Sequence, residues 1–203
     1  MAEGPGTRWL LVLGLGFVLL AVVGALTYGW LVRPAAPSPA AEVAVGGVTA
    51  RQAFAPAAKV AGQWQGDAQL AAVSGHWPAV EMRTGSQVEW AFQFFSPSTQ
   101  RLALITVAGG QAHMVRESLS PYVVSTFSAE AWRVDSERAL QTWWSRGGEN
   151  LVTRRPDADL AMQLRVPEGA EGRPVWTVVG LIAGTETAFT VMVNATDGTV
   201  IEP

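Results

Sequence analysis

Residues 88–95, VEWAFQFF, decide the fold, because their side chains alternate between two faces. One face carries Val88, Trp90, Phe92 and Phe94, and the other carries Glu89, Ala91, Gln93 and Phe95. A period of two residues is typical of a β-strand with one face on a hydrophobic core. Ser-Pro-Ser at 96–98 then predicts the end of the strand.

The following residues predict that this strand belongs to an antiparallel sheet. Residues 102–108, LALITVA, are a second strand candidate, and Gly109-Gly110 is typical of a two-residue hairpin turn. Residues 112–117, AHMVRE, then form the returning strand of the hairpin.

Further along the chain, Asp135 is a natural helix N-cap, and Glu137 puts a negative charge in the first turn. Leu140 and Trp143 lie on its apolar face, and Gly147-Gly148 predicts a left-handed C-cap. An earlier helix is predicted over 53–73 from a 3.6-residue apolar period. The remaining strand candidates are 79–83, 160–166, 175–184, 187–195 and 199–201.

The two halves of the chain share an order of elements. Trp90 and Trp176 lie 86 positions apart, and so do Val107 and Val193. The motif Trp64-x-x-Asp67 also resembles Trp132-x-x-Asp135. These spacings predict an internal duplication. The expected fold class is therefore α+β, with an N-terminal transmembrane helix followed by two repeated helix-plus-antiparallel-sheet modules, at 51–120 and 121–203.

Residues 9–32, WLLVLGLGFVLLAVVGALTYGWLV, predict a membrane anchor, since they contain no charge and would span about 36 Å as a helix. Trp9, Tyr28 and Trp30 lie at its ends, where aromatic rings favour the membrane interface. A cleaved signal peptide is the alternative, but its apolar region is normally shorter.

A short tail (1–8) precedes the anchor, and a stalk rich in Pro, Ala and Gly (33–50) follows it. A short N-terminal tail and a long C-terminal part favour a single-pass protein of the cell membrane, with its C-terminal domain outside the cytoplasm.

The composition excludes several classes of protein. A net charge of −3 argues against a nucleic-acid partner, because nucleic-acid binding needs a basic surface. The absence of cysteine excludes disulfides, thiolate zinc sites and cysteine-ligated clusters. The partners expected instead are the lipid bilayer, through 9–32, and other membrane or extracytoplasmic proteins.

The search for chemistry gives no catalytic residue, cofactor or metal site. His76 and His113 would suit copper together with Met114 or Met82, but no pair has ligand spacing, and ordinary surface positions are the favoured interpretation. Asp157 and Asp159 follow Arg154 and Arg155 without a calcium-loop pattern, which favours local charge pairing.

Tryptophan is abundant, with nine residues, so its roles need separate explanations. Trp90, Trp143, Trp144 and Trp176 fit core positions of strands and helix. Trp64, Trp77 and Trp132 remain open between the core, which is favoured, and an aromatic surface that faces a partner.

The second half resembles a PepSY-type domain, on the stretches AWRVDSERALQTWWSRGG, PVWTVVGL and FTVMVNATDGTVIE. The resemblance covers 128–203 and, more faintly, 53–117. It implies a helix packed on an antiparallel sheet and, because a peptidase-regulating role has been proposed for that family, a regulatory function. The pattern contains no catalytic residue, so none is carried over.

Three hypotheses follow. The first is a non-catalytic, membrane-anchored interaction or accessory subunit outside the cytoplasm. The second is a regulator or inhibitor of an extracytoplasmic peptidase, which rests on the family analogy. The third is an enzyme whose site forms only in the fold, for which convergent polar groups in a deep pocket would be evidence.

Overall fold

The structure, a computed structural model, describes residues 48–78, 89–170, 172–182 and 188–201. Among these residues, no helix is long and apolar enough to cross a bilayer. The features predicted outside the described residues are the tail (1–8), the anchor (9–32) with Trp9, Tyr28 and Trp30, most of the stalk (33–50), and the strand at 79–83.

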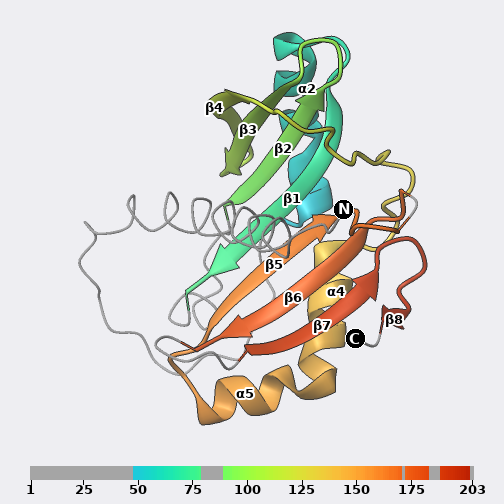
Figure 1. Ribbon diagram of the computed structural model, residues 1–203. Helices are drawn as coiled ribbons and strands as arrows, with labels where there is room; N and C mark the ends of the chain where they lie inside the picture. Colours follow the sequence, from blue (N-terminus) through green and yellow to red (C-terminus); the bar gives the residue numbers. More distant parts are fainter. Residues whose placement is uncertain (1–47, 79–88, 171, 183–187, 202–203) are drawn as a thin grey trace, which may run out of the picture. The chain divides into compact units, whose positions relative to one another are not determined.

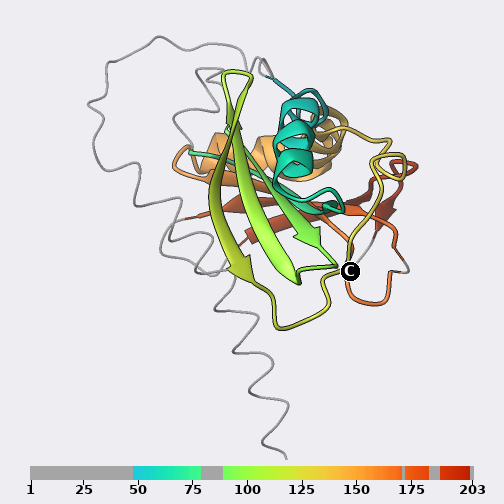
Figure 2. The same ribbon diagram turned by 90° about the horizontal axis from the view of Figure 1, so that it is seen from above.

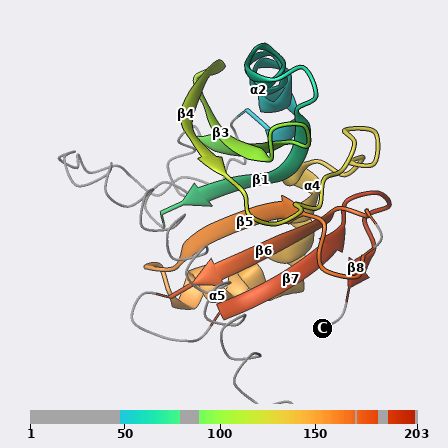
Figure 3. The same cartoon turned by 45° about the horizontal axis from the view of Figure 1, so that its top comes forward.

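The strands form one antiparallel sheet in the order β4-β3-β2-β1-β5-β6-β7-β8 (Figures 1 and 3). Their bounds are Gln69–Trp77 (β1), Trp90–Ser96 (β2), Arg101–Ala108 (β3), Gln111–Leu119 (β4), Asp159–Arg165 (β5), Val175–Leu181 (β6), Ala188–Asn194 (β7) and Val200–Ile201 (β8).

This single sheet corrects the predicted fold class, because two separate modules with their own sheets do not exist. The two halves are joined where β1 pairs with β5, from Ala72 opposite Arg165 to Trp77 opposite Leu160. That pairing leaves neither strand with a free edge and extends one hydrophobic face across both halves. Within the one sheet, the strands before residue 120 (β1 to β4) lie on one side of this pairing, and the strands after it (β5 to β8) lie on the other.

Equivalent positions in the two halves lie 86 residues apart. Trp90 lies opposite Val107, and Trp176 lies opposite Val193. The indole N–H of Trp90 donates to the carbonyl oxygen of Val48 (2.8 Å), and that of Trp176 donates to the carbonyl oxygen of Val134 (2.8 Å). The helix N-caps follow the same spacing, since Thr49 and Asp135 are also 86 residues apart. The similarity of Trp64-x-x-Asp67 to Trp132-x-x-Asp135 therefore does not relate equivalent positions of the two halves, because Thr49 is the equivalent of Asp135.

Helix α2 (Ala50–Trp64) begins with a capping box, in which the Thr49 hydroxyl accepts from the Gln52 backbone and the Gln52 side chain accepts from the Thr49 backbone. It packs on β2, β3 and β4 (Figure 2) through Ala53, Ala57 and Ala61, whose small side chains permit a close approach to the sheet.

Only the first part of the predicted helix 53–73 is helical, because α2 ends at Trp64 and β1 begins at Gln69. Leu70, Ala71 and Val73 are buried, and β1 is hydrogen-bonded between β2 and β5. Pairing on both edges outweighs the helix propensity of the alanines, which is a weak, local preference.

Helix α4 (Ser136–Trp143) begins at Asp135 as predicted. It continues through the π-helical turn η1 (Trp144–Gly148) into α5 (Glu149–Arg154), so the predicted C-cap at Gly147-Gly148 is a kink rather than an end. Gly147 does adopt a positive φ of 134°. Gly148 lies against the Trp143 ring so closely that a Cβ atom there would be 2.2 Å from it.

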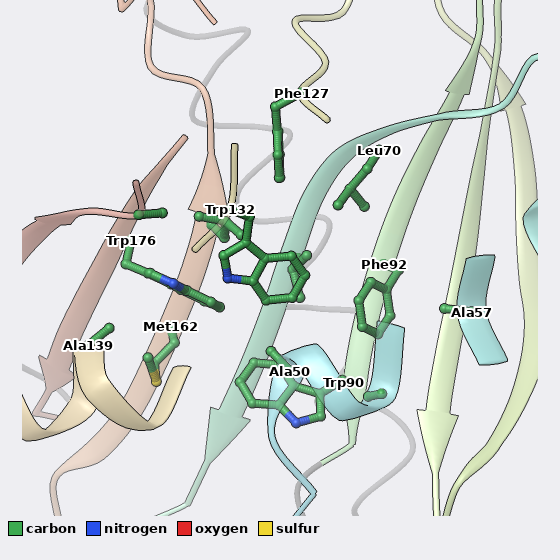
Figure 4. Packing of buried hydrophobic residues seen from close by; sticks show 14 of the residues in the cluster. Ala50, Ala57, Leu70, Trp90, Phe92, Phe127, Trp132, Ala139, Met162 and Trp176 are labelled. Atoms are coloured by element: carbon green, nitrogen blue, oxygen red, sulfur yellow. The ribbon is translucent and has the colours of Figure 1, made fainter. Parts of the chain in front are cut away.

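The hydrophobic core lies between the helices and one face of the sheet (Figure 4). Trp90 and Trp176 are 1 % and 0 % exposed, which confirms their predicted burial. Their rings meet edge to face with centroids 6.3 Å apart, and Trp132 meets Trp176 in the same way at 6.0 Å. The contact between Trp90 and Trp176 joins a strand of the first half to a strand of the second, so the two halves share one core.

Candidate interaction surface

The most unusual surface of the described residues lies along β4 and the loop after it. Among the described residues, seven large hydrophobic side chains are exposed, and five of them fall between residues 114 and 123. We call these five the β4 patch, and they are Met114 (45 % exposed), Val115 (60 %), Leu119 (72 %), Tyr122 (76 %) and Val123 (92 %). Single exposed apolar residues are ordinary, but a cluster of them indicates a contact surface.

The strand part of the patch is exposed for two reasons. β4 is the outermost strand, so its far edge faces no other described strand. The register with β3 also shifts by one residue, since Leu104 pairs with Arg116 and Ile105 pairs with Met114. Val115 is therefore an extra residue in a β-bulge, which leaves its side chain outside the regular alternation.

The loop part of the patch is held at both ends by hydrogen bonds. At its start, the Ser120 N–H donates to the Gln100 carbonyl (2.9 Å), and the Ser120 hydroxyl donates to the Tyr122 carbonyl (2.8 Å). At its end, the N–H of Phe127 donates to the Leu70 carbonyl (2.9 Å). Phe127 is buried, so the chain between these anchors presents Tyr122 and Val123 outward from a fixed base.

Leu119, Tyr122 and Val123 lie in a run without charge, since residues 118–129 read SLSPYVVSTFSA, whereas the exposed Arg116 and Glu117 follow Met114 and Val115. The nearest acidic group, Glu117, is occupied by the guanidinium of Arg101 (3.1 Å) and by the indole N–H of Trp64 (3.0 Å). Low charge together with an exposed aromatic residue is the composition of the buried centre of a protein interface.

The three tryptophans left open by the sequence take different positions. Trp132 is 0 % exposed and donates its indole N–H to the Val134 carbonyl (2.9 Å), so the partner-facing interpretation is wrong for this residue. Trp64 and Trp77 are half-buried and pack against the core. Trp77 meets Trp90 edge to face at 5.5 Å, while Trp64 reaches the β4 side of the sheet through Glu117.

The two histidines cannot share a metal ion. His76 is on β1 and His113 is on β4, with β2 and β3 between them. Three strand spacings amount to roughly 14 Å, which is far beyond any shared coordination. Among the described residues, no group of three or more potential ligands lies close enough to hold a metal.

The carboxylates singled out in the sequence form local pairs. Arg155 donates two hydrogen bonds to Asp157, at 3.0 and 2.9 Å, and these bonds hold the pKa of Asp157 below its ordinary value. Asp159 lies 3.6 Å from the Nε2 atom of His76. The expected local charge pairing is therefore confirmed for Asp157.

A cavity of about 430 Å³ lies between the second half of α2 and residues 126–129. Its apolar lining includes Phe54, Leu70 and Phe94. Two of its polar side chains satisfy each other, because the Thr126 hydroxyl donates to the Gln69 side-chain oxygen (2.7 Å). These two polar groups are therefore paired with each other, and neither by itself indicates a ligand position.

No family model, curated protein or solved structure matches this chain. The PepSY-type resemblance remains a prediction from the motifs quoted above.

Sequence reasoning missed the β4 patch. It predicted the return strand at 112–117 but treated the segment around Pro121 as a joint between modules. Two signals were present. Met114 and Val115 are consecutive apolar residues in a strand that should alternate, and an uncharged run with Tyr122 and Val123 follows it.

Proposed function

We propose that this chain is a non-catalytic interaction or accessory subunit that binds another protein through the β4 patch. On the sequence, residues 9–32 hold it in the cell membrane and the described domain lies outside the cytoplasm. The observation that carries the proposal is the concentration of exposed apolar side chains between Met114 and Val123.

The loop part of the patch is held in place at both ends, which favours a preformed binding surface rather than a flexible loop. Ser120 and Phe127 tie its ends to the sheet, so little conformational freedom is lost when Tyr122 becomes buried. Tyrosine is enriched among the residues that dominate binding energy, because it buries a large ring at a low entropy cost. The patch therefore offers an anchor for a partner.

The test of the interaction uses the tagged full chain, purified from the membranes of its native host in mild detergent. We expect one partner protein at a fixed ratio, measured by light scattering after size-exclusion chromatography. Val123→Glu should abolish this complex, because it places a charge at the most exposed position of the patch without touching the core. Ile201→Glu at the other edge of the sheet is the matched control and should leave the complex intact.

Two results would refute the proposal. One is a chain that elutes alone, without a stoichiometric partner. The other is a complex that survives Val123→Glu as well as it survives Ile201→Glu. The identity of the partner decides the more specific role, since a peptidase whose activity the chain changes would make it a regulator.

The topology is tested separately. Alkaline phosphatase fused after Pro203 should be active, because that enzyme matures only outside the cytoplasm, where disulfides form. An inactive phosphatase fusion with an active cytoplasmic reporter at the same position would reverse the orientation.

A further inference from the structure

The cavity between α2 and residues 126–129 has the composition of a site for an uncharged ring. Its volume of about 430 Å³ lies in the range of roughly 300–1,000 Å³ that ligand pockets occupy. Among the described residues that line it, none is charged, and three are phenylalanines, Phe54, Phe94 and Phe127. The rings of Phe54 and Phe94 stack with centroids 6.4 Å apart. Gly62 and Ser128 in the lining are exposed, so the cavity is open to solvent.

The second half of the chain provides a comparison for this cavity, because the residues of α2 and α4 correspond one to one. The N-caps Thr49 and Asp135 are 86 residues apart, and the buried positions of the two helices keep the same spacing. The corresponding buried residues are Ala50, Ala53 and Ala57 in α2, and Ser136, Ala139 and Trp143 in α4.

One residue that lines the cavity corresponds to a tryptophan in the second half. The spacing of 86 places Ala58 opposite Trp144, and both pack against the core from half-buried positions. The ring of Trp144 lies beside that of Trp143, with centroids 6.2 Å apart. At this helix position the second half therefore supplies an indole ring from its own chain, whereas the first half has a methyl group beside a cavity.

The cavity also lies close to the β4 patch. Three residues along the chain separate Val123 from Thr126, so their Cα atoms are at most about 11 Å apart. An ordinary protein interface covers about 800 Å² on each partner, which is wide enough to include both positions. A protein bound to Tyr122 and Val123 is therefore within reach of the cavity.

We propose that this cavity binds an aromatic side chain of the partner protein, with tryptophan as the best fit. This inference rests on the proposed function and names a second contact of the same partner. The incoming ring packs on Phe54 and Phe94 and covers Ala58, as the ring of Trp144 covers its own helix position. A charged side chain is excluded, because no lining residue offers a counter-charge for its burial. Rings that fill such cavities are among the contacts that dominate binding energy.

The probe for the test is 5-fluoroindole, added to the purified full chain in detergent. Its fluorine NMR signal is separate from the nine tryptophans of the chain. We expect the line to broaden beyond the width that detergent alone gives. Ala58→Trp should weaken this binding by about tenfold or more, because it places a ring of the chain's own in the cavity.

Gln63→Trp is the matched control. It introduces the same residue into the same helix, at an exposed position outside the lining, and should leave binding of 5-fluoroindole unchanged. Thermal unfolding shows whether each variant is folded. If Ala58→Trp does not fold, Ala58→Leu takes its place, and its smaller side chain should still weaken binding. A line no broader than in detergent alone would overturn the proposal, and so would equal binding by the folded Ala58 variant and Gln63→Trp.

The native complex tests whether the ring comes from the partner. Ala58→Trp should weaken that complex by about tenfold or more, and Gln63→Trp should leave it intact. A complex that survives Ala58→Trp unchanged, although the variant no longer binds 5-fluoroindole, would overturn the assignment to the partner and indicate a free aromatic compound as the ligand. The proposed function would still stand in that case, since its own failure is a complex that survives Val123→Glu.

Discussion

Truncation of Trp176 to alanine tests whether the two halves share one core. The side chain is fully buried and contacts the rings of Trp90 and Trp132. Its indole N–H bonds the Val134 carbonyl, which also accepts from Trp132, so the truncation does not leave that oxygen without a donor. The cost is therefore that of a large cavity, about 3–5 kcal/mol of the free energy of unfolding.

The assay is thermal unfolding of the full chain in detergent, followed by near-ultraviolet circular dichroism. For a domain of this size, that loss corresponds to a fall in Tm of roughly 6–20 °C. Trp176→Phe retains a ring and should lose less. Trp64→Ala is the control for removing a half-buried tryptophan, and it should cost roughly half as much or less, since less apolar area leaves water there.

A loss below about 1 kcal/mol for Trp176→Ala would refute the reasoning, because a buried side chain of this size cannot be removed so cheaply from a rigid core. It would mean that the region around the β1–β5 junction collapses easily or is not packed. The shared core would then not explain why the two halves form one sheet.

Three further predictions concern local features. Gly75→Ala should lower stability by about 1–3 kcal/mol, because the new Cβ atom would lie 2.8 Å from the buried Trp90 ring. Gly62→Ala lies on an open helix face and should raise stability by about 0.5–1 kcal/mol. Urea midpoints that shift in opposite directions would confirm both expectations. Asp135→Ala should cost about 1–2 kcal/mol in the same assay, since this carboxylate accepts from the first turns of both α4 and α2, and Asp135→Asn should retain most of the stability. The pKa of Asp67 is lowered, chiefly by the hydrogen bond from the Ser96 hydroxyl. The stabilisation by this carboxylate is therefore present above its ordinary pKa of 3.8 and is lost as the pH falls through the lower pKa of the folded state. Asp67→Asn should reduce the fall of Tm at acidic pH, and an unchanged fall would contradict the assignment.

Local features of the fold were predictable from the sequence. A strand within 90–95, the Gly109-Gly110 turn and the Asp135 cap all fall where the sequence predicts them, although β2 is buried on both faces rather than on one. Each depends on neighbouring residues alone, through side-chain period, positive φ or a carboxylate near free N–H groups. The error at 65–73 arose because alanine periodicity looks helical when the flanking strands are unknown.

The β4 patch was predictable only in part. The uncharged run 118–129 is visible in the sequence, but apolar residues in a run of this kind are just as compatible with a buried strand. Phe127 illustrates the ambiguity, since it is buried while Val123, four residues earlier, is 92 % exposed. The difference depends on the hydrogen bond from Phe127 to Leu70, which links positions far apart in the chain.

By itself, the sequence determined the kind and order of most elements, β1 being the exception, and the 86-residue spacing of Trp90 and Trp176. Only the tertiary structure decided that the halves form one sheet, that Trp132 is buried, and that β4 is the outermost of the described strands beside β3. The physical reason is that strand pairing and burial are long-range properties. The same apolar strand satisfies its backbone equally well beside either neighbour, so the choice of β5 as the partner of β1 is made by the packing of the whole core.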